Sequence, residues 1–325
     1  MLVLGLQGSP KKKGNTSFLL SAFMNEAKKL GARTHVIEVA KKNITPCMGC
    51  AFCEKNGYCV NQDDDMKPEI YPLLREADVI VAASPIYFYN VTAQLKALID
   101  RCQALWSRKY KLELTDPARN YRRGFLLSLG ATKGQNLFEG VHLTAQYFFD
   151  AVAATYEGSL TYRRIEYPGN MEKHPTVLED VKEAVNGLLS PLIGRKKILF
   201  VCRENACRSQ MAGAFVQHLA GDKIEVLCGG SEPAVEINPV MVEAMAEKGV
   251  DMAFRKPRSI EDAISAGQPD VIITIGCEEE CPFVPGAERQ DWDLPDPAGK
   301  PIDLMRNVRD EIEMRVKELV NSLSG

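Results

Sequence analysis

The sequence lacks any apolar run near the roughly 20 residues that a helix needs to cross a bilayer. Its N-terminal apolar stretch is too short for a signal peptide and passes directly into a loop. The sequence also lacks an excess of one charge, since 40 basic and 43 acidic side chains give a net charge of −3. This balance indicates neither a nucleic-acid surface nor a polybasic membrane patch. It has no internal repeat and no low-complexity tract. We therefore expect a cytoplasmic globular protein that binds neither membranes nor nucleic acid.

Ten cysteines remain to be explained in a chain for which we expect no disulfide framework. Four of them lie within residues 47–59 and five lie after residue 200. This clustering indicates metal or redox chemistry. Cys102 and Cys228 are the exceptions, and we expect both to pack in the core, because a free cysteine behaves mostly as a small hydrophobic residue.

At 325 residues the chain is long for one core, and its pattern predicts two α/β domains, 1–193 and 194–325. Pro191 and Gly194 mark the joint. Strands are predicted at 2–8, 34–40, 78–84, 125–131 and 153–160, then at 197–201, 224–228 and 270–276. Helices are predicted at 16–31, 91–106, 136–152 and 177–189, then at 211–220, 239–249, 259–265 and 302–323. Alternating strands and helices predict three-layer domains with parallel sheets covered on both faces.

The stretch ILFVCRENACRSQ, residues 198–210, carries the strongest chemical signal. The four apolar residues before Cys202 predict a buried strand, and a helix pattern follows Ser209. At such a junction the loop N–H groups and the helix dipole attract a tetrahedral anion and stabilise a thiolate. Arg208 can hold two anion oxygens with its planar fork. A core cysteine beside a surface arginine would leave Asn205, Arg208 and Ser209 unexplained. We therefore predict an enzyme with Cys202 as its nucleophile.

Three predicted loops follow strands of the first domain and together favour a flavin site. GSPKKKGNTS, residues 8–17, is a small, hydroxyl-rich loop at a helix N-terminus, which suits a phosphate. It lacks the glycine spacing of dinucleotide and nucleoside triphosphate loops. SPIYFYN at 84–90 and GATKGQ at 130–135 are expected at the same sheet edge, where flavodoxin-like folds bind FMN. The aromatic side chains there could flank the flavin ring, or could be core or interface residues. The candidate FMN-binding residues are Ser9, Pro10, Gly14, Asn15, Thr16, Ser17, Pro85, Ile86, Tyr87, Phe88, Tyr89, Asn90, Gly130, Ala131 and Thr132.

Cys47, Cys50, Cys53 and Cys59 are spaced C-x2-C-x2-C-x5-C. A zinc site usually separates its two cysteine pairs by a longer loop. Three cysteines at consecutive three-residue intervals instead favour the compact ligation of a [4Fe–4S] cluster. Reduced surface thiols without a metal are the alternative.

The motifs GSPKKKGNTS, PCMGCAFCEKNGYCVNQDDDM and SPIYFYN together resemble the NADPH-dependent FMN reductase group and its iron–sulfur flavoprotein branch. The resemblance covers roughly residues 1–190. It implies a flavodoxin-like fold, bound FMN, NAD(P)H as an electron donor and a homo-oligomer.

Residues 196–325 resemble the low-molecular-weight tyrosine phosphatases and the arsenate reductases built on the same fold. In both groups a D-P dipeptide near the C-terminus supplies the general acid, which makes Asp296 the candidate here. Asp291 and Asp293 are less favoured substitutes. Tyrosine phosphatases usually follow this dipeptide with aromatic residues, whereas this chain has Ala298-Gly299. That departure favours the arsenate reductases.

The second domain also carries thiols that a phosphatase does not need. A phosphoenzyme is cleared by water, whereas an arsenate adduct is better cleared by a second thiol, which leaves a disulfide. The resemblance implies that Cys202 attacks arsenate while Asp296 protonates the departing oxygen. Cys277 would then attack Cys202 and release arsenite, and Cys281 would resolve the disulfide. Only three residues separate Cys277 and Cys281, fewer than in the thioredoxin-coupled relatives. The order in which the thiols react therefore stays open, as does whether Cys207 or a small-molecule thiol takes the place of one of them.

These patterns predict an arsenate reductase fused to an FMN and iron–sulfur domain that supplies electrons. The electrons would come from NAD(P)H, a thioredoxin-like reductant or ferredoxin. Three alternatives stay open: a flavin oxidoreductase with a vestigial second domain, a low-molecular-weight tyrosine phosphatase, and a non-catalytic redox sensor.

Overall fold

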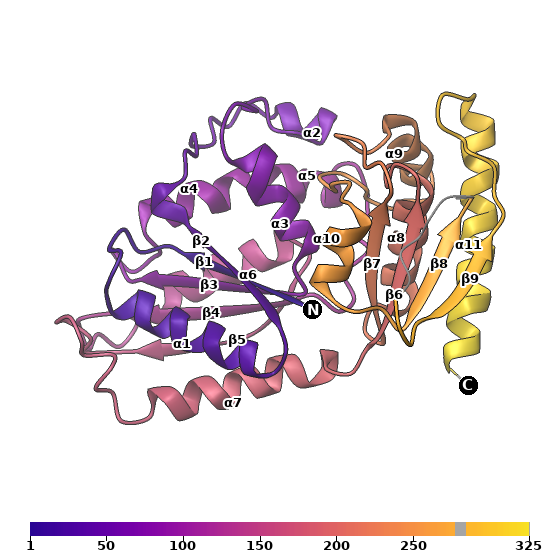
Figure 1. Cartoon of the computed structure of the whole chain (residues 1–325). Helices are drawn as coiled ribbons and strands as arrows, with labels where there is room; N and C mark the ends of the chain where they lie inside the picture. The colour runs from indigo at the N-terminus through magenta and orange to yellow at the C-terminus, as the bar shows by residue number, and fades with distance from the viewer. Residues whose placement is uncertain (277–283, 325) are drawn as a thin grey trace. The chain divides into compact units, whose positions relative to one another are not determined.

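The computed structural model describes residues 1–276 and 284–324. It divides into two units (Figure 1). Unit 1 contains residues 1–113 and 121–193, and unit 2 contains residues 114–120 and 194–325. Both units are α/β with a parallel sheet, as the sequence predicts.

The sheet of unit 1 has the strand order β2-β1-β3-β4-β5, with every pairing parallel. This is the order of flavodoxin-like folds. The strands are β1 Leu2–Gln7, β2 Arg33–Glu38, β3 Val79–Pro85, β4 Arg123–Leu129 and β5 Thr155–Tyr162. The central strands are apolar along nearly their whole length because helices cover both faces of the sheet.

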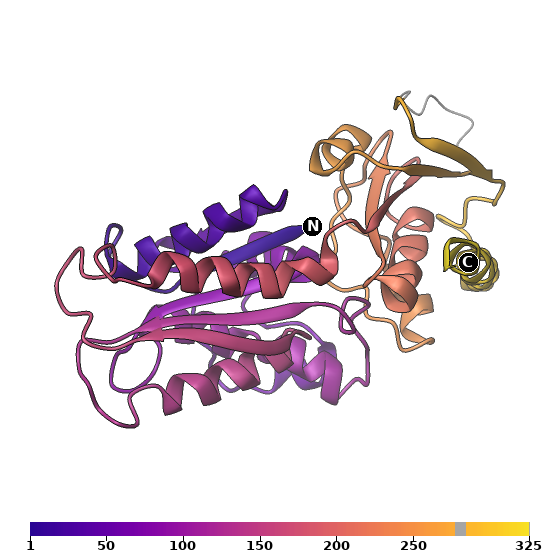
Figure 2. The same ribbon diagram turned by 90° about the horizontal axis from the view of Figure 1, so that it is seen from below.

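Helices α1 and α7 cover one face of this sheet, and α3 to α6 cover the other (Figure 2). Phe23 of α1 packs on Phe125 with 5.7 Å between ring centroids, whereas Gly124 faces Phe149 of α6. The single helix predicted at 91–106 is wrong: the chain turns at Cys102 and forms two helices. The helices are α1 Asn15–Lys29, α2 Phe52–Asn56, α3 Tyr71–Glu76, α4 Ala93–Arg101, α5 Gln103–Tyr110, α6 Glu139–Ala151 and α7 Val177–Leu189.

The sheet of unit 2 has the order β7-β6-β8-β9, again parallel. Ile198 and Phe200 pack toward α8, α9 and α11, and the alternate residues Leu199 and Val201 pack toward α10. The strands are β6 Lys196–Cys202, β7 Ile224–Gly230, β8 Val271–Ile275 and β9 Glu288–Trp292. The helices are α8 Arg208–Ala220, α9 Pro239–Ala246, α10 Ile260–Ala266 and α11 Ile302–Ser324.

Strand β9 is missing from the sequence prediction. Its residues, ERQDW, are polar except for Trp292, because an edge strand need not bury both faces. The hydropathy pattern that reveals a central strand is therefore absent there.

The short segment 114–120 belongs to unit 2 although it lies in sequence between α5 and β4. The Thr115 N–H donates to Gly249 O at 2.7 Å, and the Asp251 N–H donates to Thr115 O at 2.9 Å. These two bonds form a parallel β-bridge between Thr115 and Val250.

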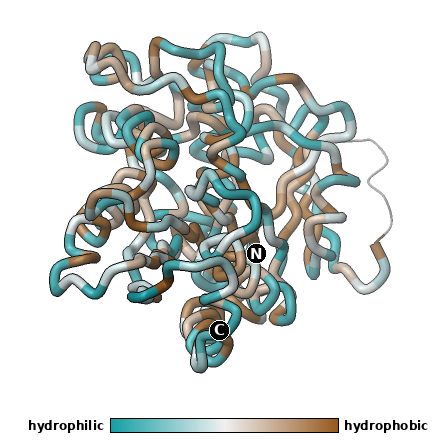
Figure 3. The backbone as a smooth tube through the Cα atoms, turned by 90° about the vertical axis from the view of Figure 1, so that its left-hand side faces the viewer, coloured by the Kyte–Doolittle hydropathy of each residue, from teal (hydrophilic) through white to brown (hydrophobic). Residues whose placement is uncertain are grey.

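The helices carry both hydrophobic and hydrophilic residues, including the C-terminal α11 (Figure 3). Met305, Val308, Ile312 and Val316 of α11 are buried, at the three- and four-residue spacing of an amphipathic helix. None of the helices that the structure describes is both long and apolar enough to cross a membrane.

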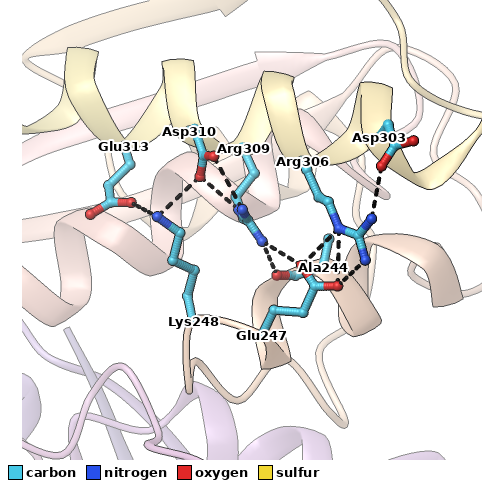
Figure 4. A network of polar contacts seen from close by, with 8 residues as sticks. All are labelled: Ala244, Glu247, Lys248, Asp303, Arg306, Arg309, Asp310 and Glu313. Carbon is cyan, nitrogen blue, oxygen red and sulfur yellow. Dashed lines mark hydrogen bonds and ion pairs between the residues drawn. The ribbon is translucent and has the colours of Figure 1, made fainter.

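An ion-pair network ties the end of α9 to α11 (Figure 4). The Arg306 Nε donates to both Glu247 carboxylate oxygens at 3.0 Å. Arg309 donates to the same carboxylate at 3.0 Å and to Ala244 O at 2.6 Å. Lys248 pairs with Asp310 at 3.1 Å. These contacts link α9 to α11 at the edge of the apolar interface between the two helices.

We expect the network to make the stability of unit 2 depend on pH. Hydrogen bonds from Arg306 and then Arg309 lower the pKa of Glu247 from 4.5 to about 2. The stabilisation is therefore present above pH 4.5 and is lost as the pH falls toward 2. Glu247→Gln should lower the melting temperature of unit 2 at pH 7, and the difference from wild type should close near pH 2.

Thermal unfolding followed by calorimetry from pH 7 to pH 2 measures this effect. Glu318→Gln on the exposed face of α11 is the control, since it removes the same charge outside the network. A constant difference between wild type and Glu247→Gln across this range would contradict the assignment.

Candidate functional site

The nucleophile loop joins the end of β6 to the start of α8. Cys202 is the last residue of β6 and is only 2% exposed. Its Sγ lies 2.9 Å from Ser209 Oγ, and Asn205 Nδ2 donates to the same oxygen at 2.8 Å. Because the amide nitrogen only donates, the Ser209 hydrogen is free to point at the sulfur. The hydroxyl group can therefore donate a hydrogen bond to the sulfur.

Asn205 sets the shape of the loop. It is fully buried and has a φ of +51°, a left-handed conformation that asparagine tolerates better than most residues. Its Oδ1 accepts from the Arg258 N–H at 3.0 Å and from Gln210 Nε2 at 3.1 Å. Gly230 lies against the loop so closely that a Cβ there would be 2.6 Å from Arg203 O.

Three loop carbonyl groups accept hydrogen bonds from the segment that follows β7. The carbonyl oxygens of Arg203, Glu204 and Ala206 accept from the N–H groups of Glu232, Ala234 and Asn238 at 2.9, 2.9 and 3.1 Å. A concave row of N–H groups at a helix N-terminus binds a tetrahedral anion.

Arg208 is the first residue of α8 and follows this loop directly. It is 4% exposed, and its Nη2 pairs with Asp296 Oδ2 at 3.1 Å. Its Nη1 donates to Leu294 O at 3.2 Å and to Gly276 O at 3.4 Å. Within the part of the chain that the structure describes, its buried Nε has no hydrogen-bond partner.

Asp296, the predicted general acid, lies beside Arg208. Its Oδ1 accepts from the Ala298 N–H at 3.0 Å, and its other oxygen pairs with Arg208. The side chain is 48% exposed, so it can exchange protons with water. Asp291 instead lies on β9 and accepts from Thr274, while Asp293 is exposed and makes no comparable contact with Arg208.

The other described thiols of unit 2 are held in their protonated form. Burial raises the pKa of Cys207 to about 12, with Cys202 and Asp296 adding to the shift. Burial likewise raises the pKa of Cys228 to about 11. Cys228 Sγ donates to Ser209 O at 3.3 Å, so this thiol lies beneath the start of α8. Cys277 and Cys281 lie outside the described residues.

In unit 1 the structure brings the three predicted flavin loops to one sheet edge. The Gly8 N–H donates to Ala83 O at 2.8 Å, and Thr92 Oγ1 donates back to Gly8 O at 2.6 Å. The Ile86 N–H donates to Leu129 O at 2.9 Å. The fifteen candidate FMN residues lie on these loops, in the first turn of α1 or, for Pro85, at the end of β3.

The aromatic loop is strained and exposed. Tyr87 and Asn90 exchange backbone hydrogen bonds of 2.8 and 3.0 Å around a tight turn. Phe88 and Tyr89 occupy the two central positions with φ of +47° and +62°, which aromatic residues seldom adopt. Phe88 is fully exposed. Strain combined with an exposed aromatic surface is typical of a binding site.

Two residues at this edge escaped the sequence prediction. The side-chain amide atoms of Gln7 are buried and find no partner among residues 1–276 and 284–324. Tyr167 O accepts from Asn15 Nδ2 at 2.9 Å and so adds the loop after β5 to the site. The sequence could have indicated Gln7, because it is a polar residue at the end of an otherwise apolar strand. Nothing in the sequence indicated Tyr167.

These features fit FMN. The N-terminus of α1 begins at Gly14 with no side-chain cap, which leaves its N–H groups for a phosphate. The buried amide of Gln7 and the exposed aromatic turn supply further polar and apolar contacts.

The four clustered cysteines line one cavity of about 660 Å³. Cys47 and Cys50 are exposed, Cys53 and Cys59 are half-buried, and Ser107 Oγ donates to Cys53 Sγ at 3.4 Å. No group of three metal-ligating side chains converges on one point among the described residues. In a [4Fe–4S] cluster each cysteine binds a different iron, so convergence on one point is not required. Four thiols around one cavity therefore fit a cluster by their chemistry.

Two family models match separate parts of the chain. NADPH-dependent FMN reductase matches residues 1–133, and low molecular weight phosphotyrosine protein phosphatase matches residues 197–325. An iron-sulfur flavoprotein of Methanocaldococcus jannaschii is 42% identical over 105 residues, 32% of this chain and 53% of that protein. The chain thus spans about half the length of the curated iron–sulfur flavoproteins it matches.

The second unit aligns over nearly the whole of other proteins. Arsenate reductase 2 of Staphylococcus haemolyticus is 36% identical over 126 residues, 38% of this chain and 95% of that protein. Among solved structures, a thioredoxin-dependent arsenate reductase of Corynebacterium glutamicum is 31% identical, covering 46% of this chain and 77% of that one with a TM-score of 0.36.

The loop geometry predicts separate effects on stability and on anion binding. Asn205→Ala removes three buried hydrogen bonds and places alanine at a positive φ, and should lower the free energy of unfolding of unit 2 by roughly 2–4 kcal/mol. Asn205→Asp keeps the Oδ1 acceptor but adds a negative charge, and should bind inorganic sulfate at least about tenfold more weakly.

Denaturant unfolding and titration calorimetry with sulfate measure the two effects. If Asn205→Asp bound sulfate as tightly as wild type, the loop would not be the anion site.

Proposed function

Since residues 197–325 belong to the low-molecular-weight phosphotyrosine protein phosphatase family, and within it to the arsenate reductases, we propose that the protein reduces arsenate to arsenite. One observation carries the proposal. Cys202 is buried with its Sγ 2.9 Å from Ser209 Oγ, and Arg208 at the start of the following helix pairs with Asp296, while its Nε has no partner among the described residues. The guanidinium group of Arg208 and the N–H groups at the start of α8 suit the oxygens of arsenate.

In the first step Cys202 acts as the nucleophile. Its thiolate attacks arsenic, so an S–As bond forms and one As–O bond breaks. Arg208 and the loop N–H groups hold the remaining oxygens and balance their charge. Asp296 gives its proton to the departing oxygen, which leaves as water.

In the second step two thiols supply the two electrons. The Cys277 thiolate attacks Cys202 Sγ, the S–As bond breaks toward arsenic, and arsenite leaves. Cys281 then attacks Cys277, which moves the disulfide to the Cys277–Cys281 pair and frees Cys202. The high pKa of Cys207 supports this order, because a protonated thiol is a poor nucleophile.

Ala298-Gly299 after the catalytic aspartate supports arsenate over an aryl phosphate, since aromatic residues that would line a phenyl ring are missing there. A rate of aryl phosphate hydrolysis far above that of arsenate reduction would select the phosphatase function instead.

Unit 1 is proposed to bind FMN and a [4Fe–4S] cluster. Ser9, Asn15, Thr16 and Ser17 would hold the phosphate, and the 85–90 and 130–132 loops the flavin ring. Cys47, Cys50, Cys53 and Cys59 would hold the cluster. When bound, the flavin stores two electrons and the cluster transfers one at a time. The proposed electron donor is NAD(P)H, ferredoxin or a thioredoxin-like protein. Unit 1 is also proposed to form the interface of a homo-oligomer.

Single-turnover assays should separate the roles of the thiols. Cys202→Ser should lower arsenate reduction by about 10⁴-fold or more, and Asp296→Asn by about 10²- to 10⁴-fold. Cys281→Ser should release one arsenite per chain and stop, whereas Cys277→Ser should release none. The product is quantified by separating arsenite from arsenate after rapid quenching.

Cys228→Ser serves as the control, because this thiol has no role in the proposed relay. If Cys277→Ser released arsenite stoichiometrically, the proposed order of thiols would be wrong.

We also propose that unit 1 supplies the electrons that reduce the Cys277–Cys281 disulfide. Protein reduced at its flavin and mixed anaerobically with excess arsenate should regain the flavin absorbance in wild type, as the flavin gives its two electrons to the disulfide that the first arsenate leaves. Cys202→Ser should stay reduced. Equal reoxidation of the two proteins would refute the coupling, and the spectrum of the anaerobically purified protein shows beforehand whether flavin and cluster are present.

A further inference from the structure

A buried arginine bridges both ends of the cysteine segment, residues 45–64. Arg101, at the end of α4, has a fully buried side chain. Its Nη1 donates to Thr45 O at 2.8 Å and its Nη2 donates to Asn61 O at 2.7 Å. Thr45 lies two residues before Cys47, and Asn61 two residues after Cys59.

Asp64 completes the arrangement. Its carboxylate pairs with Arg101 and is itself only 2% exposed. Its Oδ2 also accepts from the Thr45 N–H at 3.1 Å, and its Oδ1 accepts from the Met66 N–H at 3.1 Å. The Tyr71 hydroxyl donates to Arg101 O at 2.7 Å, which anchors the end of α4 in turn.

A buried ion pair is weak evidence for stability. Removing two charges from water costs free energy that their attraction repays only partly, and well-packed apolar residues often serve equally well. The Arg101–Asp64 pair nevertheless joins backbone groups that are sixteen residues apart, Thr45 and Asn61, with a planar fork that no apolar side chain reproduces. Its effect is therefore on the conformation of the segment between them.

We propose that Arg101 and Asp64 are positioning residues that hold the cysteine segment ready to bind the iron–sulfur cluster. The proposal rests on the proposed cluster. Closing the segment at its base limits the conformations open to Cys47, Cys50, Cys53 and Cys59 before any iron arrives. Cluster assembly then starts from thiols that already line one cavity.

Three variants of the full-length protein separate this role from general stability. Arg101→Lys keeps the charge, but a single ammonium group does not reproduce the fork between Thr45 O and Asn61 O. Arg101→Met combined with Asp64→Leu replaces the ion pair by apolar volume that is expected to fold. Arg122→Lys is the matched control.

The control is chosen because Arg122 has the same chemistry elsewhere in unit 1. It is fully buried and donates to Ala77 O, Val152 O and Arg75 O at 2.9, 2.9 and 2.7 Å. None of these acceptors lies in the cysteine segment.

Iron and sulfide per chain are measured after anaerobic purification, and hydrogen exchange of residues 45–64 after the iron has been chelated. Both Arg101 variants should hold at most about a tenth of the wild-type iron and should exchange this segment at least about tenfold faster. Arg122→Lys should melt at a lower temperature yet keep the wild-type iron content and the slow exchange.

Wild-type iron content in the apolar double variant would overturn the proposal, as would an equal loss of iron in Arg122→Lys. If wild type itself takes up no iron, the cluster is refuted, and exchange then decides on the positioning role alone. Unchanged exchange in the Arg101 variants would overturn that role as well.

Discussion

Parallel strand pairing is the constraint on which both units depend. Each parallel connection needs a crossover, and such crossovers bring the carboxyl ends of neighbouring strands to the same edge. In unit 1 that edge collects the loops after β1, β3 and β4. In unit 2 it places Cys202 beside its register partner Gly230, where no larger residue has room. Segments distant in sequence thus meet without any side chain having to join them.

Buried arginines contact the loops whose conformation strand pairing does not determine. Arg208 is held by two backbone carbonyl groups and Asp296, so its guanidinium group is already in position without a ligand. Arg101 joins two carbonyl groups on either side of the cysteine segment. A guanidinium group suits both tasks because its planar donors fit several acceptors at once. In both units, the position of a loop is determined by a charged side chain from a helix.

Local sequence was enough to predict what depends on neighbouring residues. The order of strands and loops, the Cys202–Ser209 loop and the cysteine spacing are all contained in short stretches. The polar edge strand β9 was missed because its residues carry no alternating hydropathy, and the turn at Cys102 because both helices around it share one apolar pattern. Contacts such as Arg101 with Asp64, or Asn15 with Tyr167 O, join residues 37 and 152 positions apart, which no local pattern encodes.

The raised pKa values of the buried thiols bear on how the chain survives oxidants. With a pKa of about 12 for Cys102 and Cys207 and about 11 for Cys228, roughly one molecule in 10⁴ or fewer carries the thiolate at neutral pH. Peroxide reacts with the thiolate, so these sulfur atoms react with it more slowly than thiols of ordinary pKa. Burial thereby isolates three sulfurs from disulfide scrambling and reserves exchange chemistry for the others. A polypeptide with ten cysteines can in this way work through disulfides and still keep a single pattern of connectivity.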